Sequence, residues 1–136
     1  MDKKLKHLEM IQAVISRMAG NSFLLKGWSI TLTAAVFALA SNKDSHALLV
    51  LVALLPVIMF WWLDGFFLHQ ERLFRELYDH VRLMEEDKID FSMDTSPFQD
   101  SVKTVSQIIW STTLKNFHLP VATIVGFVFI LLLIYR

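Results

Sequence analysis

Two ionisable residues, Lys26 and Asp64, lie within stretches of the chain that are otherwise almost purely apolar. The short turn at 41–46 makes these stretches an antiparallel hairpin, in which residues whose numbers sum to about 90 lie at the same depth. Lys26 and Asp64 meet this condition. Because a charge among apolar groups is costly unless it is paired or reaches water, we predict that the two side chains form an intramembrane ion pair.

This ion pair has two interpretations. It could fasten the two stretches together and set their register, or it could form a charged gate that handles ions. Fastening is the simpler interpretation, and Lys26 could also extend to water by itself. The pair alone is therefore no demonstration of transport.

Hydroxyl side chains follow Lys26 in the same stretch, at Ser29, Thr31 and Thr33. They could pack tightly against another helix, or they could line a path for water. A row of small residues at helical spacing favours packing, because such rows let apolar helices approach one another closely. The members of this row are Gly27, Thr31, Ala34, Ala38 and Ser41.

Other kinds of chemistry are poorly represented in the chain. There is no cysteine, the five histidines are scattered without metal-site spacing, and the four glycines form no phosphate-binding loop. The acidic run between Glu85 and Asp100 is typical of a solvated loop, and no basic, aromatic surface indicates nucleic-acid binding. We therefore expect no catalytic, cofactor or metal site, no nucleic-acid partner and no enzyme activity.

Three apolar blocks must position the charged pair. Hydrophobic residues make up 54% of the 136 residues, and they are concentrated in blocks near the ~17–25 residues that a helix needs to cross a bilayer. The sequence predicts an all-α integral membrane protein with one membrane domain over 1–136 and three transmembrane helices. The predicted order is an amphipathic cytoplasmic helix at 1–20, spans at 22–41 and 47–67, a cytoplasmic extension at 68–87, a loop at 88–95, an amphipathic cytoplasmic helix at 96–116 and a span at 119–135.

The placement of charge predicts the orientation of these spans. With three spans, all the lysines and arginines lie on one side except Lys43 and Arg136. Such an excess marks the cytoplasmic side, so we expect the N-terminus in the cytoplasm and the C-terminus outside it. Trp28, Trp61 and Trp62 fall where an aromatic belt would meet this side of the bilayer, and they are predicted to be interfacial anchors.

Apolar stripes continue outside the three blocks. The segments 2–19 and 71–86 each carry a stripe at helical spacing, and both extend from adjacent spans. The first stripe could lie on anionic lipid or pack on another helix. Packing is favoured because the second stripe is a candidate partner, so the two are predicted to meet as an antiparallel pair next to the membrane. Their members are Leu5, Leu8, Ile11 or Gln12, Ile15 and Met18 in the first, and Leu73, Phe74, Leu77, Val81 and Met84 in the second.

A third stripe is predicted on the helix at 96–116. Its start has Ser96 as N-cap, Pro97 at the first helical position and Gln99 as the reciprocal partner of the cap. Local breaks are also expected in the long helices, because glycine and proline disfavour helical backbone. They are an interruption at Gly20-Asn21, a kink at Pro56 and a break or kink at His118-Leu119-Pro120.

Three segments carry a resemblance to a known group of proteins. They are KHLEMIQAVISRMAGNSFLLKGWSITL at 6–32, FWWLDGFFLHQERLFRELYDHVR at 60–82 and IDFSMDTSPF at 89–98. With these parts in this order, nearly the whole chain resembles small bacterial multi-span membrane proteins associated with TIR-like and other phage-defence genes. It is also broadly similar to small multi-span effectors that breach the membrane in bacterial conflict systems. The resemblance implies an effector and carries over no catalytic residue.

These observations support two functions of different classes. In the first, copies assemble in the bacterial inner membrane through the cytoplasmic helices and the small-residue row, and the homo-oligomer permeabilises or depolarises the membrane in anti-phage defence. In the second, the chain is a membrane anchor or scaffold whose cytoplasmic helices recruit a soluble signalling or sensor protein. We prefer the first, because it uses the polar residues of the first span. A transporter fits less well, since no inverted repeat or broken helix pair is evident.

Overall fold

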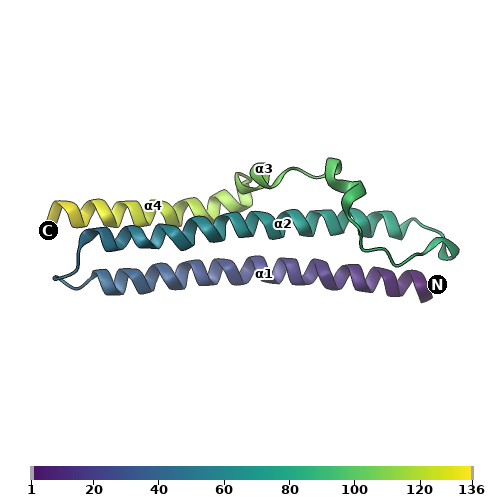
Figure 1. Cartoon of the computed structure of the whole chain (residues 1–136), viewed down its shortest axis with the longest axis horizontal. Coiled ribbons are helices and arrows are strands. Elements are labelled where there is room, and N and C mark those ends of the chain that lie inside the picture. The colour runs from purple at the N-terminus through teal and green to yellow at the C-terminus, as the bar shows by residue number, and fades with distance from the viewer. Residues whose placement is uncertain (1, 136) are drawn as a thin grey trace.

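The computed structural model describes residues 2–135, which are mainly helical and include no β-strand (Figure 1). Three long helices lie side by side in one elongated bundle. α1 (Asp2–Ala40) is antiparallel to α2 (Leu54–Arg82), and α4 (Thr112–Tyr135) lies along the half of α2 that is away from the N-terminus. The predicted all-α architecture is confirmed; Arg136 lies outside the described residues.

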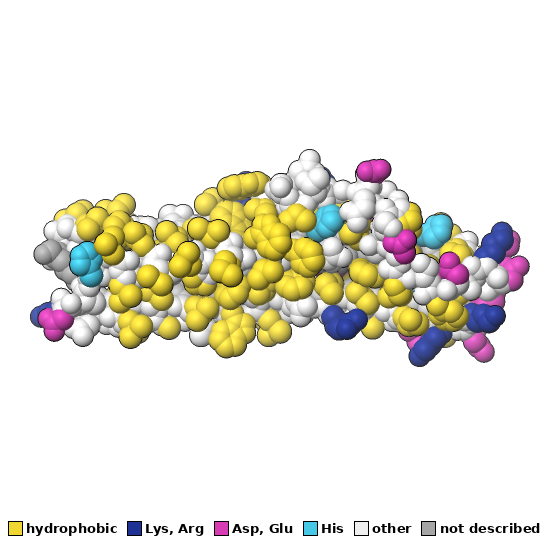
Figure 2. Space-filling model, in the orientation of Figure 1, with side chains coloured by type: hydrophobic (Ala, Val, Ile, Leu, Met, Phe, Trp, Pro, Cys, Tyr) yellow, Lys and Arg dark blue, Asp and Glu magenta, His cyan; other side chains and the backbone are white. Residues whose placement is uncertain are grey.

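Three helical segments of this part of the chain are long and apolar enough to cross a membrane. They are Asp2–Ala40, Ala47–Arg82 and Thr112–Tyr135, with 39, 36 and 24 residues. At the usual rise per residue α1 is about 58 Å long, roughly twice the thickness of a bilayer's hydrocarbon layer. A bilayer can therefore cover only part of α1 and α2. Charged side chains gather at the end of the bundle that holds the N-terminus, beyond a broad apolar surface (Figure 2).

α1 continues without a break through Gly20 and Asn21, so the predicted interruption between an N-terminal helix and the first span is wrong. A glycine inside a helix costs only about 1 kcal/mol relative to alanine. This cost is small beside the packing on both sides of it, because one buried stripe runs along the whole helix. The buried residues of that stripe are His7, Ile11, Ile15, Ser29, Thr33 and Ala40.

The apolar stripes of α1 and α2 meet in a core near the N-terminus, whose buried members are Ile11, Ile15, Leu77 and Val81. The stripe of α1 is rotated from the predicted one. Leu5 is 55% exposed, whereas the imidazole of His7 is fully buried and its Nε2 lies 2.8 Å from the carbonyl oxygen of Ser92. A histidine takes the inward position because it can donate this bond to the loop that covers the core.

The connection between α2 and α4 is not the single helix predicted at 96–116. It contains two short 3-10 helices, η2 (Glu86–Lys88) and η3 (Ser96–Ser101), and the short helix α3 (Val105–Ile109). This connection lies along the half of α2 that α4 leaves uncovered (Figure 1).

The helix caps explain why the prediction at 96–116 fails. Ser96 does not act as an N-cap, because its amide and its hydroxyl both donate to the carboxylate of Asp94. These bonds hold the pKa of Asp94 below its usual value. The capping box lies further along: the Thr104 hydroxyl accepts from the Gln107 amide, and the Gln107 side chain accepts from the Thr104 amide. With Val102 extended just before this cap, α3 begins only at Val105.

Neither proline interrupts a long helix. The second apolar block begins as a 3-10 helix, η1 (Ala47–Ala53), and Pro56 lies in the first turn of α2, where its missing N–H removes no bond within α2. α4 begins at Thr112 and runs through Pro120, so of the break or kink predicted at 118–120 the break is wrong. One proline removes only one backbone bond, and apolar helices packed on neighbours tolerate that loss.

A second core closes the end of the bundle that holds the turn between α1 and η1. Its buried members are apolar and come from three elements, α1, η1 and α4. We call it the hairpin-end core. It consists of Ala40, Val50, Ala53 and Val125, with Val36, Phe37, Leu49, Leu54, Val128, Phe129 and Leu132 packed against it.

Candidate functional site

Asp64 is a fully buried carboxylate on the apolar helix α2. Lys26 of α1 donates from Nζ to Asp64 Oδ2 at 2.6 Å, so the structure brings together the two residues that the sequence paired by depth. Ser22, one turn before Lys26 on the same face, donates its hydroxyl to Asp64 Oδ1. Lys26 Nζ also donates to Ser22 Oγ at 2.9 Å, which closes a ring of three polar side chains.

The third long helix contributes His118 to the same carboxylate. The imidazole of His118 is fully buried, and its Nε2–H donates to Asp64 Oδ2 at 2.7 Å. Its other ring nitrogen, Nδ1, has no hydrogen-bond partner among the described groups. Asp64 thus accepts bonds from α1 and from α4, and a single carboxylate joins all three long helices.

Aromatic rings enclose this cluster. Trp61 stacks on the imidazole of His118, with ring centroids 5.8 Å apart, and its indole N–H donates to the carbonyl oxygen of Ile109 at 2.8 Å. Lys26 Nζ lies 5.8 Å from the centroid of the Phe117 ring, close enough for a cation–π contact. The rings keep water from the buried groups and hold the imidazole against Asp64.

The predicted interfacial tryptophans divide into two kinds. Trp28 and Trp62 are 57% and 53% exposed, as an anchor in the head-group region requires. Trp61, in contrast, is partly buried and belongs to the wall of the Asp64 cluster. Its indole bond ties α3 to α2 beside the cluster.

Gly65 lets α3 cover the cluster. A Cβ atom at this position would lie 2.7 Å from Cγ1 of Ile109, which is closer than real Cβ contacts come. Only a residue without a side chain therefore allows α3 to sit directly on α2 next to Asp64.

The three predicted hydroxyl residues do not share a face. Thr31 is exposed and donates to the carbonyl oxygen of Gly27, whereas Ser29 and Thr33 are buried in the bundle. Thr33 donates to the carbonyl oxygen of Ser29 at 2.8 Å, but the buried hydroxyl of Ser29 has no partner in the described part of the chain.

The inward-facing side chains Ser22, Lys26, Ser29 and Thr33 recur every three or four residues on α1. We call them the polar row. They span roughly 16 Å along the helix axis, beginning at the Asp64 cluster. The row ends where the hairpin-end core begins, so it is closed at that end by apolar side chains.

The small-residue row faces the other way. All of its members are exposed, and a Cβ added at Gly27 would meet no heavy atom within 4 Å. The row therefore takes no part in packing the three helices of one chain. It is left as an open surface on α1, beside the exposed side chains of Phe23 and Trp28.

Comparison of the chain with protein-family models, with curated protein sequences and with solved structures gives no match. The geometry of the molecule alone must therefore indicate what this cluster can do.

The sequence did not predict that Ser22 and His118 belong to the site. For Ser22 a signal was present, since it lies four residues before Lys26 and must share its face. For His118, the long connection before α4 leaves the register of α4 against α2 undetermined. The signal that remains is the position of His118 at the start of an apolar block. Residue numbers give the relative depth of two residues in helices that are joined by a tight hairpin. They do not give it across a connection of some thirty residues.

The arrangement can hold and exchange a proton. A carboxylate, an ammonium group, an imidazole and a hydroxyl are in direct contact inside an apolar bundle. Asp64 and Lys26 neutralise one another, which lowers the cost of burying both. No set of three histidine or acidic side chains in the described residues could hold a metal ion.

Proposed function

We propose that this chain is an oligomeric effector of the bacterial inner membrane that depolarises or permeabilises the membrane, in the anti-phage setting that its resemblance implies. One observation carries the proposal: the buried Asp64 cluster joins three apolar helices and continues into the polar row. Ionisable groups at membrane depth are expensive to place, and they commonly mark the path of an ion or a proton.

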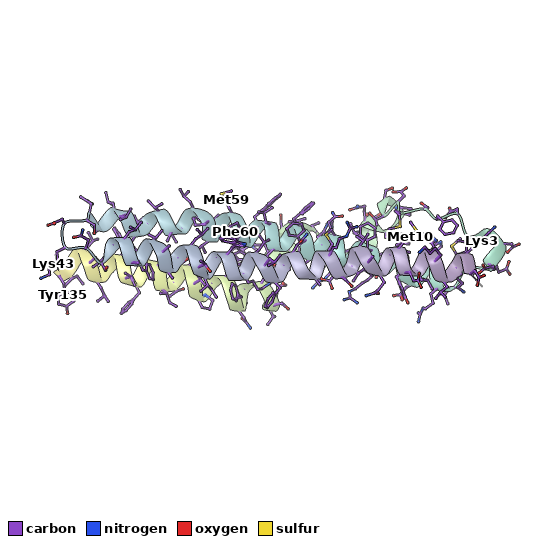
Figure 3. All side chains as sticks on the ribbon, turned by 90° about the horizontal axis from the view of Figure 1, so that it is seen from below. Lys3, Met10, Lys43, Met59, Phe60 and Tyr135 are labelled. Carbon is purple, nitrogen blue, oxygen red and sulfur yellow. The ribbon has the colours of Figure 1, made fainter. Side chains whose placement is uncertain are left out.

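We also propose an orientation of the bundle in the membrane. Charged side chains gather at the end of the bundle with the N-terminus (Figure 2), and Lys3 and Met10 lie there, far from Lys43 and Tyr135 (Figure 3). We place this charged end in the cytoplasm, in line with the excess of basic residues expected on that side. The Asp64 cluster then lies near the cytoplasmic surface of the membrane and the hairpin-end core near the outer surface.

The proposal also includes assembly of several copies. Three helices packed on one another leave no room for a wide pore, so a permeable state requires either several chains or a rearranged bundle. The exposed small-residue row offers a surface on which a second α1 can approach closely.

The decisive experiment is a measurement of membrane potential with a voltage-sensitive dye in bacteria. The protein is induced alone, and then together with its genomic neighbours, with its amount in the membrane measured in parallel. We expect loss of potential in at least one condition, and we expect Asp64→Asn to change it. A steady potential in both conditions, with the protein present in the membrane, would contradict the proposal.

The alternative function, an anchor or scaffold for a soluble protein, is favoured by a groove at the charged end. It is lined by side chains of α1, α2 and the connection, among them His7, His80, Asp90, Asp94 and Phe98. In that case substitutions in the groove, such as Phe98→Ala, abolish function, whereas Asp64→Asn has no effect unless it unfolds the bundle. The membrane-potential experiment with both variants separates the two functions.

A further inference from the structure

We propose that the ion which crosses the membrane through this protein is the proton, carried along the polar row and exchanged at the carboxylate of Asp64. This inference rests on the proposed function and names the substrate of the same site. Its basis is the burial of the row, the charge of the cluster and two polar atoms that lack partners.

Burial distinguishes a proton from a metal cation. Ser29, Asp64 and His118 have no exposed surface, and Thr33 is 6% exposed, so protein atoms fill the space around them. A Na⁺ or K⁺ ion needs a path wide enough to hold it and a shell of oxygen ligands. A proton passes along hydrogen-bonded side chains of the acidic and histidine type without such a path.

The charges of the cluster also favour a proton over a metal cation. Lys26 Nζ lies 2.6 Å from Asp64, so the carboxylate is already neutralised by a fixed cation. A mobile metal cation would meet the ammonium group of Lys26 at the same place and would be repelled by it. A proton is repelled by the same charge, but unlike a metal cation it forms a covalent O–H bond with the carboxylate, and Lys26 is then released from the pair.

Two of the buried polar atoms without a hydrogen-bond partner in the described residues belong to the polar row and the cluster: Oγ of Ser29 and Nδ1 of His118. Buried polar groups without partners are rare in folded proteins, because each costs free energy. Ser29 lies three residues beyond Lys26 on the polar row, and His118 bonds directly to Asp64. Both atoms are therefore free to take up a hydrogen bond at the moment when a proton arrives.

The transfer leaves the protein unchanged. A proton that reaches Asp64 from the side of Ser29 forms an O–H bond with the carboxylate, and the Lys26 ammonium group loses its partner. The O–H bond then breaks as the proton passes to water near Lys26, whose side chain is 22% exposed. The carboxylate pairs with Lys26 again, and the net result is one proton moved from one side of Asp64 to the other.

The hairpin-end core is the barrier that this route must open. It separates Thr33 from the outer end of the bundle, and two of its buried residues, Val50 and Ala53, come from the 3-10 helix η1. Hydrogen bonds in a 3-10 helix have poorer geometry than those of an α-helix, so η1 is held less firmly than α2. Movement of η1 that lets water into this core would connect the polar row to the outside.

The test uses bacteria in the condition that gives loss of membrane potential, suspended in a mildly acidic medium whose Na⁺ and K⁺ are replaced by N-methylglucamine. Membrane potential and cytoplasmic pH are recorded together. The proton route predicts that the potential is still lost and that the cytoplasm acidifies toward the medium. Loss of potential only when Na⁺ or K⁺ is present, with cytoplasmic pH unchanged, overturns the proton and leaves the proposed function standing. No loss of potential in either medium overturns both.

Four variants locate the route. Asp64→Asn, which cannot take up a proton, should slow acidification by about a hundredfold, and Asp64→Glu should restore part of it. Ser29→Ala removes only an unpaired hydroxyl, so it folds and should still slow acidification severalfold. Thr123→Val is the matched control, because Thr123 is an exposed threonine of α4 that donates to the carbonyl oxygen of Leu119. If Ser29→Ala acidifies as fast as Thr123→Val, the polar row is not the route.

Discussion

At the scale of single residues, Asp64 has the largest structural consequence. A buried carboxylate is tolerable only with partners, and here they come from two other helices: Ser22 and Lys26 of α1 and His118 of α4. Each bond also restricts the others, because all four polar groups must fit into one packed site. The cluster therefore fixes the register of the bundle whatever else it does, and its structural and functional roles must be separated by experiment.

A pair of variants separates the two roles. Asp64→Ala leaves the Lys26 ammonium group without its partner, and we expect a loss of about 3–5 kcal/mol in the free energy of unfolding. Replacing both charges by apolar residues, as in Lys26→Met with Asp64→Leu, should recover most of that loss. Thermal unfolding followed by circular dichroism in detergent measures the difference.

The double variant then answers the functional question. If the pair only fastens the helices, the stable double variant dissipates the membrane potential like the natural chain. If Asp64 exchanges protons, the double variant is folded but inactive. Equal instability of the single and double variants would show that Ser22 and His118 also need the carboxylate.

At the scale of elements, α3 depends on one glycine for its place. Gly65 allows Ile109 to lie against the backbone of α2, and the bond from Trp61 to the Ile109 carbonyl holds α3 there. α3 in turn covers the side of α2 next to Asp64. A change at Gly65 should therefore be felt in the cluster, although Gly65 makes no polar contact with it.

Gly65→Ala is expected to destabilise the bundle by about 1–3 kcal/mol, since the new methyl group overlaps Ile109. Gly20→Ala is the control, because the same change in α1 meets no heavy atom within 4 Å and should stabilise the helix by about 0.5–1 kcal/mol. Unfolding temperatures of the two variants should therefore move in opposite directions from that of the natural chain. A rise in unfolding temperature for both variants would mean that α3 does not pack against Gly65.

At the scale of the whole molecule, the two faces of α1 have different partners. Its inward face carries the polar row and the buried stripe, whereas its outward face carries the small-residue row, whose members are all exposed. The length of α1, about twice that of a bilayer's hydrocarbon layer, makes a large part of it available outside the membrane.

Bulky side chains on the small-residue row should weaken assembly. Gly27→Leu and Ala34→Leu together are expected to shift the chain toward monomer in detergent, by about tenfold in the association constant. Gly126→Leu on α4 is a suitable control, since its added Cβ also meets no heavy atom within 4 Å. Cross-linking and light scattering report the number of copies. An unchanged assembly in the double variant would remove this row from the interface.

The orientation can be tested independently of activity. A fluorescent protein fused before Asp2 should fluoresce, and alkaline phosphatase fused after Tyr135 should be active, if the charged end is cytoplasmic and the other end is outside. The reverse pattern for both fusions would show the opposite orientation, with the Asp64 cluster near the outer surface.

The sequence alone determined the features that depend on composition and on local spacing. Three long apolar segments specify three long helices, and a tight turn fixes the register between the first two, which is why Lys26 and Asp64 could be paired from their numbers. The apolar stripe of α2 near Leu77 followed from spacing in the same way.

The tertiary structure decided what depends on packing between distant segments. The addition of His118 and Trp61 to the cluster, the cover by α3 and the split of the hydroxyl residues between two faces all follow from how α4 and its connection dock. No local sequence pattern predicts the register of α4 against the other helices, because the connection is long and offers more than one candidate helix cap. The tertiary structure also decided that α1 is continuous through Gly20, because packing along the entire helix outweighs the small local cost of one glycine.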